Sequence, residues 1–347
     1  MFYELEDIQR RHNLYWDIYN VEGWVTPADQ SHVWNLQRGA IAGLTGQFLQ
    51  ETWTAFQQNW RLLAKRYEEP QNFRQVGTYI KTILKMDNYR LALKNRWQYA
   101  FAMGTFSTAP TYAFFRWING GWERPFGGFE YNILRKIPGA IVTAAVTAPL
   151  SVPFEIARMT FYADKTFPKE LQRGYTSYFN ALRRIPFEEG PYWLFKNSFP
   201  IYFRNFLTTL TMFYTYDFLK DKCSFMWRVG DMPFPPVKAF LIGFSAWISL
   251  VFSYPFAETA KQMVDFWPKE KGGVCSFNNN YRQAAVWLWY HDFSTNYFPG
   301  FFNNYFWRMF PGMFASLYIA DSFGMFTPNV IDLTSGQGNN TWEDSIV

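Results

Sequence analysis

The sequence has few of the residues from which catalytic and metal sites are usually built. Two cysteines, Cys223 and Cys275, support no disulfide framework, and three scattered histidines lack the spacing of metal ligands. The chain also lacks a Gly-x-Gly-x-x-Gly motif, a P-loop and a Gly-x-Ser-x-Gly motif. We therefore expect a protein that is not an enzyme and that holds no metal and no organic cofactor.

The N-terminal region lacks the apolar core of a secretory signal peptide. It carries Glu4, Glu6 and Asp7, and an acidic start also argues against a cleavable, Arg-rich mitochondrial presequence. Aromatic residues, by contrast, are abundant: 38 Phe, 22 Tyr and 16 Trp make up 22% of the 347 residues. We expect most of these rings to face lipid or the core, and the others to anchor helices at membrane interfaces or to contact partner proteins.

Six apolar segments of about 20 residues, the length that crosses a bilayer, follow one another along the chain. They cover residues 34–60, 96–118, 137–159, 200–219, 237–256 and 301–326. One such segment would fit a buried helix of a soluble protein, but six in series favour an all-α membrane protein. The first contains Gly39-Ala-Ile-Ala-Gly43, a spacing of small residues that allows close helix approach.

The loops that follow the odd-numbered segments are basic. Residues 61–96, 158–197 and 258–292 together hold 20 Lys and Arg against 11 Asp and Glu, whereas the rest of the chain has more acidic than basic residues. These loops therefore belong on the positive side of the membrane, with both chain termini on the other side.

An internal repeat of about 100 residues runs through the chain. Gly39-Ala-Ile and Gly139-Ala-Ile lie 100 residues apart, and each precedes an equivalent kink position, Trp53 or Pro153, by 14 residues. A third kink, at Pro255, follows Pro153 by 102 residues. Each unit is predicted to contain a long helix, a basic loop with a short amphipathic helix, and a second long helix. The expected fold is a pseudo-symmetric bundle of six transmembrane helices, with repeats at about 33–125, 126–228 and 229–325, preceded by an N-terminal arm (1–32) and followed by a C-terminal tail (326–347).

Charged motifs occur at both ends of the second repeat. Pro153-x-Glu155-x-x-Arg158 places an acid and a base on one helical face, and Tyr216-Asp217-x-x-Lys220 lies at the other end of the unit. With the amphipathic segment at 175–190 between them, these motifs resemble the mitochondrial carrier family over roughly residues 34–325. The resemblance implies a carrier-like domain (33–325) in the mitochondrial inner membrane, with its basic loops in the matrix and both termini in the intermembrane space. It also implies two salt-bridge networks that close alternately, each built from one acid and one base of every repeat.

The first and third repeats depart from this pattern. Trp53, Ala55 and Gln58 replace the proline, acid and base of the first repeat, and Ala257 and Ala260 replace the acid and base of the third. The charged residues of the second repeat are therefore expected to be remnants of the networks without partners in neighbouring repeats; they are Glu155, Arg158, Asp217 and Lys220. Glu155 and Arg158 would instead pair locally or contact lipid or another chain.

Glu258 and Lys261 keep the acid–base spacing of the third repeat one position late. One residue turns a helix by about 100°, so both are expected to point away from the cavity axis unless the kink at Pro255 compensates. The sequence leaves open whether they substitute for the lost pair.

The resemblance also assigns substrate-contact and lipid-contact positions. The substrate-contact positions of the even-numbered helices are Ala102-Met103, Arg204-Asn205 and Trp307-Arg308. Arg204, Asn205 and Arg308 would hold a small carboxylate if the protein transports; alternatively, both arginines would hydrogen-bond backbone carbonyls in a closed bundle. Bound cardiolipin is expected at the starts of the even-numbered helices, marked by Lys94, Asn95, Lys196, Asn197 and Gly300.

Two functions compete. Because charges of both networks are missing from two repeats, the preferred interpretation is a carrier-like protein that has lost transport. It would be a structural or accessory subunit of a larger inner-membrane assembly, with a respiratory-chain complex as the leading candidate. Its arm and tail would contact other subunits, membrane lipids would be its other partners, and no contact with nucleic acid is expected. The alternative is an active, divergent carrier that exchanges a small anion of the carboxylate class by alternating access.

Overall fold

The structure is a computed structural model that describes residues 32–67, 70, 72–122, 133–165, 172–188, 190–195, 198–222, 235–263, 281–323 and 325–326. Within these ranges the chain forms helices and connecting turns, so the described part is all-α. The N-terminal arm up to residue 31 and the C-terminal tail from residue 327 lie outside the described residues, as do the contacts expected of them.

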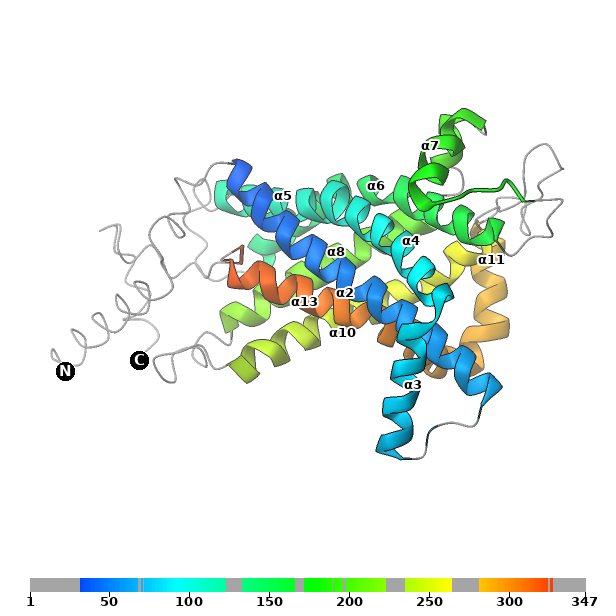
Figure 1. The fold of residues 1–347 in the computed structure, drawn as a ribbon. Helices are drawn as coiled ribbons and strands as arrows, with labels where there is room; N and C mark the ends of the chain where they lie inside the picture. The colour runs from blue at the N-terminus through cyan, green and yellow to red at the C-terminus, as the bar shows by residue number, and fades with distance from the viewer. Residues whose placement is uncertain are drawn as a thin grey trace.

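The described helices form long runs that lie side by side (Figure 1). They are α2 (His32–Arg66); the series α4 (Asp87–Met103), η1 (Gly104–Thr108) and α5 (Ala109–Trp122); α6 (Ile133–Asp164); α8 (Phe199–Lys222); α10 (Pro235–Met263); and the series α12 (Ser294–Gly300), η6 (Phe301–Phe306) and α13 (Trp307–Ser322). Each run contacts the next one along the chain, and α13 packs against α2. The six runs, one for each predicted apolar segment, therefore close into a ring.

Shorter helices connect the two long runs of each repeat. They are α3 (Phe73–Lys85), α7 (Tyr178–Glu188) with η3 (Pro191–Phe195), and α11 (Tyr281–Leu288) with η5 (Trp289–Phe293). Helices α3, α7 and α11 all lie at the end of the bundle where α2, α6 and α10 finish, which we call the short-helix end (Figure 1). The predicted order of long helix, short helix and long helix is thus found in each repeat.

Glycines in α2 allow both of its neighbours to approach closely. A Cβ at Gly39 would lie 2.7 Å from the carbonyl oxygen of Ala109, and a Cβ at Gly43 would lie 2.8 Å from Thr108 Cβ. On the other side of α2, a Cβ at Gly46 would lie 2.5 Å from Ser316 Cβ of α13. The small-residue spacing in the first segment therefore marks a close helix contact, as predicted.

Buried aromatic side chains fill both ends of the ring. At the short-helix end, a cluster includes Tyr99, Phe161, Tyr178 and Trp193. At the opposite end, Phe326 packs with rings that include Tyr112, Phe115, Phe213 and Tyr216. Part of the aromatic excess therefore belongs to the protein core, while rings such as Phe106 and Trp117 are exposed on the outer surface.

The helices α6 and α10 continue through the prolines at the predicted kink positions, Pro153 and Pro255. A proline has no N–H to donate to the carbonyl four residues earlier, which for Pro255 is the carbonyl of Val251. That oxygen accepts a hydrogen bond from Tyr297 Oη of α12 at 2.9 Å. A side chain of the neighbouring run therefore satisfies the backbone group that the proline leaves free.

Replacing Tyr297 with phenylalanine is expected to destabilise the protein by about 1 kcal/mol, because the Val251 carbonyl loses its donor. Thermal unfolding of the purified protein in detergent measures this, with Tyr192→Phe at an exposed tyrosine as the matched control. In a Pro255→Ala background the backbone N–H can bond to the Val251 carbonyl, so Tyr297→Phe should cost much less. An equal loss of stability in both backgrounds would show that the Tyr297 hydroxyl does not compensate for the hydrogen bond that Pro255 cannot donate to the Val251 carbonyl.

Two described helices are long and apolar enough to cross a membrane by hydropathy alone, over Ile137–Asp164 and Val237–Lys261. They are the first long helices of the second and third repeats. The equivalent helix of the first repeat, α2, is interrupted by polar residues such as Gln47, Gln50 and Gln57. Hydropathy therefore identifies two of the six predicted spans. The other four helical runs lie beside these two in the ring.

Two of the predicted helix starts are wrong. Lys94 and Asn95 lie inside α4, which begins at Asp87, so their backbone N–H groups are within the helix rather than at its end. Gly300 ends α12 and continues directly into η6; a Cβ there would lie 2.5 Å from the hydroxyl of Tyr254, which explains the glycine by packing. Lys196 and Asn197 precede α8 but lie outside the described residues.

Candidate functional site

One buried carboxylate binds two arginines at the short-helix end. Arg96 Nη1 donates to Glu51 Oε2 at 2.7 Å, and Arg158 Nη2 lies 2.8 Å from Glu51 Oε1. The side chain of Glu51 is fully buried, and those of Arg96 and Arg158 are 4% and 11% exposed. We call these three residues the Glu51 cluster. It joins α2 and α4 of the first repeat to α6 of the second.

The expectation that Arg158 lacks a partner in a neighbouring repeat is wrong. Glu51 lies four residues before Ala55, where the first repeat was expected to supply its acid. Residues four apart lie on the same helical face, so Glu51 projects its carboxylate from one turn earlier in α2. Gln58, at the position of the lost base, accepts a hydrogen bond from Arg96 Nη2 at 2.6 Å. A search for acids one turn from the expected position would have found Glu51 in the sequence.

Glu155 is also paired, but within its own repeat. Its Oε1 accepts hydrogen bonds from Arg204 Nη2 and, at 3.1 Å, from Asn205 Nδ2. Arg204 Nε donates to Asn205 Oδ1 at 2.9 Å, and Asn205 Nδ2 also donates to Ser151 Oγ. The structure thus brings together two of the three predicted substrate-contact residues. In this conformation Glu155 pairs with Arg204 instead of Arg158, and Arg204 binds a carboxylate of the protein instead of the expected backbone carbonyls.

The third repeat supplies no charge at the equivalent positions. Ala257 and Ala260 are buried in the core. One residue later, Lys261 Nζ lies 2.5 Å from Glu258 Oε1, which makes a local i, i+3 pair instead of a bridge to another repeat. Lys261 was expected to point away from the cavity axis, but it lines a cavity between the first and third repeats.

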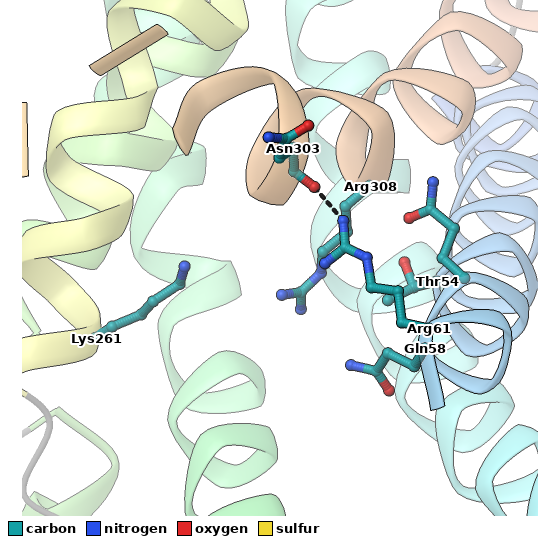
Figure 2. Close-up of a pocket in the computed structure, with 7 residues that line it drawn as sticks. Thr54, Gln58, Arg61, Lys261, Asn303 and Arg308 are labelled. Atoms are coloured by element: carbon teal, nitrogen blue, oxygen red, sulfur yellow. Dashed lines mark hydrogen bonds between the residues drawn. The ribbon is translucent and has the colours of Figure 1, made fainter. Parts of the chain in front are cut away.

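A cavity of about 220 Å³ lies between the first and third repeats. Its lining, which we call the basic cavity, comprises Thr54, Gln57, Gln58 and Arg61 of α2, Lys261 of α10, Asn303 of η6 and Arg308 of α13. Figure 2 shows the side chains of Arg61 and Arg308 converging from two walls, with Lys261 reaching toward them from a third. Arg61 Nη2 donates to the carbonyl oxygen of Asn303. Of the described residues, three basic groups and no carboxylate therefore line this space.

The surroundings of the basic cavity are positive as well. Among the described residues, the charged groups around it include Arg61, Arg96, Arg158, Lys261 and Arg308, of which Arg96 and Arg158 bind Glu51 and Lys261 binds Glu258. Arg308 interacts electrostatically with Arg158, Glu51 and Arg96. Its Nε is buried and has no hydrogen-bond partner among the described residues. Such an arrangement favours an anion that can accept several charge-assisted hydrogen bonds.

An aromatic groove of about 330 Å³ adjoins the basic cavity and shares Gln57, Arg61 and Asn303 with it. Its other lining residues are Trp53, Phe56, Trp60 and Trp307. Trp53 Nε1 donates to the carbonyl oxygen of Trp307 at 2.8 Å and so ties α2 to α13. Trp53, which replaces the expected proline, thus contributes to this contact between repeats.

At the opposite end of the bundle, Lys238 Nζ lies 2.8 Å from Asp321 Oδ2 and donates to Ser322 Oγ at 2.9 Å. This contact joins α10 and α13 of the third repeat. Asp217 is buried near the end of α8. The side chain of Lys220 lies outside the described residues.

The short helix α7 is fastened to the helix that carries Glu155. Tyr178 Oη of α7 donates to the carbonyl oxygen of Phe154 at 3.2 Å. Burial raises the pKa of Tyr178, so this phenol remains protonated and able to donate at physiological pH.

Comparison with known proteins agrees with the order of the motifs. The family model for mitochondrial carrier proteins matches residues 129–226, which correspond to the second repeat. The chain is 28% identical over 124 residues to the putative mitochondrial transporter UCP3 of Homo sapiens, a match that covers 35% of this chain and 40% of that protein. It is 28% identical over 143 residues to the mitochondrial dicarboxylate/tricarboxylate transporter DTC of Arabidopsis thaliana, covering 40% of this chain and 47% of that protein.

These matches span less than half the length of the relatives. Proteins of the matched family are multi-pass transport proteins of the mitochondrial inner membrane and are not enzymes. The matched repeat and the carrier relatives lead to one conclusion: residues 129–226 are a mitochondrial carrier repeat, and the chain is a divergent relative of mitochondrial carriers.

Proposed function

We propose that this protein is an active carrier that exchanges a small carboxylate anion across the inner membrane by alternating access. All six helical runs of the ring would cross the membrane. The observation that carries the proposal is the basic cavity, in which Arg61, Lys261 and Arg308 converge without a lining carboxylate. Glu258 pairs with Lys261, but a cluster with this excess of positive charge is costly inside a membrane protein unless an anion or water occupies it.

The size and chemistry of the basic cavity favour a small substrate. Its volume of about 220 Å³ is below the range of about 300–1,000 Å³ typical of sites for drug-sized ligands. A short dicarboxylate offers two separated carboxylates, and each can accept paired hydrogen bonds from a guanidinium group. Nucleotides are too large for this space as it stands.

The Glu51 cluster would act as the gate at the short-helix end. It joins the first and second repeats through buried ion pairs that can form only when α2, α4 and α6 are close together. Opening this end separates Glu51 from Arg158, so this ion pair would break and re-form in each transport cycle. The charge pattern would place this end in the matrix and both termini in the intermembrane space.

The cross-repeat ion pair changes the balance between the two functions considered from the sequence. Loss of transport is expected if the charged residues of the second repeat have no partners, whereas Arg158 binds Glu51 and Glu155 binds Arg204. The carrier relatives also favour transport.

Reconstitution into liposomes tests the proposal. Purified protein should exchange internal for external dicarboxylate and discriminate against ADP and against monocarboxylates. Arg204→Ala is expected to abolish exchange, because it removes a predicted contact and strands Glu155. Exchange that is unchanged in Arg204→Ala would remove this arginine from the substrate path.

An accessory role is the second candidate, and one observation favours it. Large aromatic residues at the short-helix end are strongly exposed outside the apolar segments; they are Phe73 (97%), Phe187 (84%), Tyr192 (76%) and Tyr290 (73%). Exposed aromatic rings are enriched where proteins meet. In mild detergent, an accessory subunit would co-purify at constant stoichiometry in a large complex. Migration alone, near 41.1 kDa plus detergent, would rule this role out.

A further inference from the structure

The three-fold arrangement of the repeats indicates which salt bridge is missing between the third repeat and the first. Glu51 of the first repeat binds Arg158 of the second, so an acid near the kink of one repeat pairs with the base of the next. Applied to the third repeat, the same rule requires a bridge from position 257 to position 58 of the first repeat. These positions hold Ala257 and Gln58, and neither can supply the charge.

The basic cavity occupies the place of this lost bridge. Gln58 is one of its lining residues, Arg61 follows Gln58 on α2, and Lys261 and Arg308 reach it from the third repeat. Both walls therefore carry basic side chains where one acid and one base would normally meet, and Glu258 pairs with one of them, Lys261. Without a counter-anion, Arg61 and Arg308 repel each other across a contact that hydrogen bonds such as that from Trp53 Nε1 to the Trp307 carbonyl hold together.

We infer that a small dicarboxylate bound in the basic cavity supplies the missing bridge between the third and first repeats, so that the short-helix end closes fully only when the anion is present. The inference rests on the anion site of the proposed function and assigns a second role to its occupant. Arg308 and Lys261 bind the anion from the third repeat, and Arg61 binds it from the first. The ligand thereby becomes a component of the gate.

The lining of the basic cavity defines the ligand class. An anion that bridges two walls needs oxygens at both ends, so a dicarboxylate satisfies the site and a monocarboxylate leaves one wall uncompensated. The anionic headgroup of a lipid could bind the same basic groups by entering through the adjoining aromatic groove. Assays in detergent without added lipid, and with added anionic lipid, separate these two sources.

Thermal unfolding of the purified full-length protein tests the inference, with succinate as the probe and acetate and chloride at equal ionic strength as controls. Succinate is expected to raise the unfolding temperature by about 5 °C at about 100 times its dissociation constant. Acetate and chloride should raise it much less. A succinate response that appears only with anionic lipid, or equal responses to all three anions, would overturn the dicarboxylate bridge.

Two variants with matched controls locate the site. Gln57→Glu adds a carboxylate to the basic cavity, so it should raise the unfolding temperature without succinate and abolish the succinate response. Gln75→Glu on exposed α3 should leave the succinate response unchanged. Lys261→Gln should weaken succinate binding about tenfold, whereas Lys81→Gln on α3 should not. A Gln57→Glu protein that responds to succinate like the wild type, or an undiminished affinity in Lys261→Gln, would contradict the inference.

Exchange assays on the same proteins separate this inference from the proposed function. A succinate response with the predicted variant pattern, but without exchange, refutes transport and supports the bridge. Exchange by a protein whose stability does not depend on succinate supports transport and refutes the bridge.

Discussion

Replacing Glu51 with alanine should destabilise the protein by about 3–5 kcal/mol and lower its unfolding temperature by about 10 °C, because the change strands two buried arginines. Arg96 and Arg158 are 4% and 11% exposed and both bind this carboxylate, so no water can replace it fully. Fluorescence-detected thermal unfolding in detergent measures the shift. Few single substitutions in this chain should cost as much.

The matched control for Glu51 is Glu188, whose side chain is 37% exposed and lies 2.5 Å from Arg184 Nε in an i, i+4 pair on α7. Glu188→Ala should cost about 0.5 kcal/mol or less, since exposed pairs contribute little. Arg158→Met removes one of the two stranded charges, so the double variant Glu51→Ala/Arg158→Met should be more stable than Glu51→Ala alone. A shift no larger than that of Glu188→Ala would show that the Glu51 cluster is not a buried gate.

Replacing Arg308 with glutamine should lower dicarboxylate exchange by about 10- to 100-fold, since a lost hydrogen bond to a charged group costs about 1.5–3 kcal/mol. Arg308 is the predicted contact residue that lines the basic cavity, whereas Arg204 is already bound to Glu155. The rate of exchange into liposomes, measured over a range of external substrate concentrations, gives the effect on affinity and on maximal rate.

The control for Arg308 is Arg74→Gln, at an exposed arginine on α3 that lines neither the basic cavity nor the aromatic groove. Its exchange rate should match the wild type. Arg308→Lys keeps the charge but loses the paired donors, so it should fall between the wild type and Arg308→Gln. Full activity in Arg308→Gln would place the substrate elsewhere.

The sequence predicted the fold well because its signals were periodic. The repeat near 100 residues, the Gly39 and Gly43 spacing and the short amphipathic helices each have a local cause, and the structure contains all of them. Helix starts were less accurate. Lys94 and Asn95 resemble a helix start by motif, but α4 begins at Asp87, directly after the C-terminal end of α3.

The site was predicted only in part, because ion pairing depends on three-dimensional reach more than on position in a motif. Position 55, where the motif expects an acid, holds alanine, while Glu51 binds Arg158 from the preceding turn of α2. The pairing of Glu155 with Arg204 joins residues 49 apart, which no local pattern specifies. The basic cavity depends on Lys261 and Arg61, whose convergence follows from the closed ring between α2, α10 and α13.

Uptake of labelled succinate into liposomes that contain the purified, folded protein tests dicarboxylate transport most directly. Uptake into vesicles loaded with unlabelled succinate should be well above uptake into empty vesicles and into vesicles without protein. Uptake no greater than in protein-free vesicles, from a preparation whose thermal unfolding shows a folded protein, would contradict the claim that this carrier transports a small dicarboxylate.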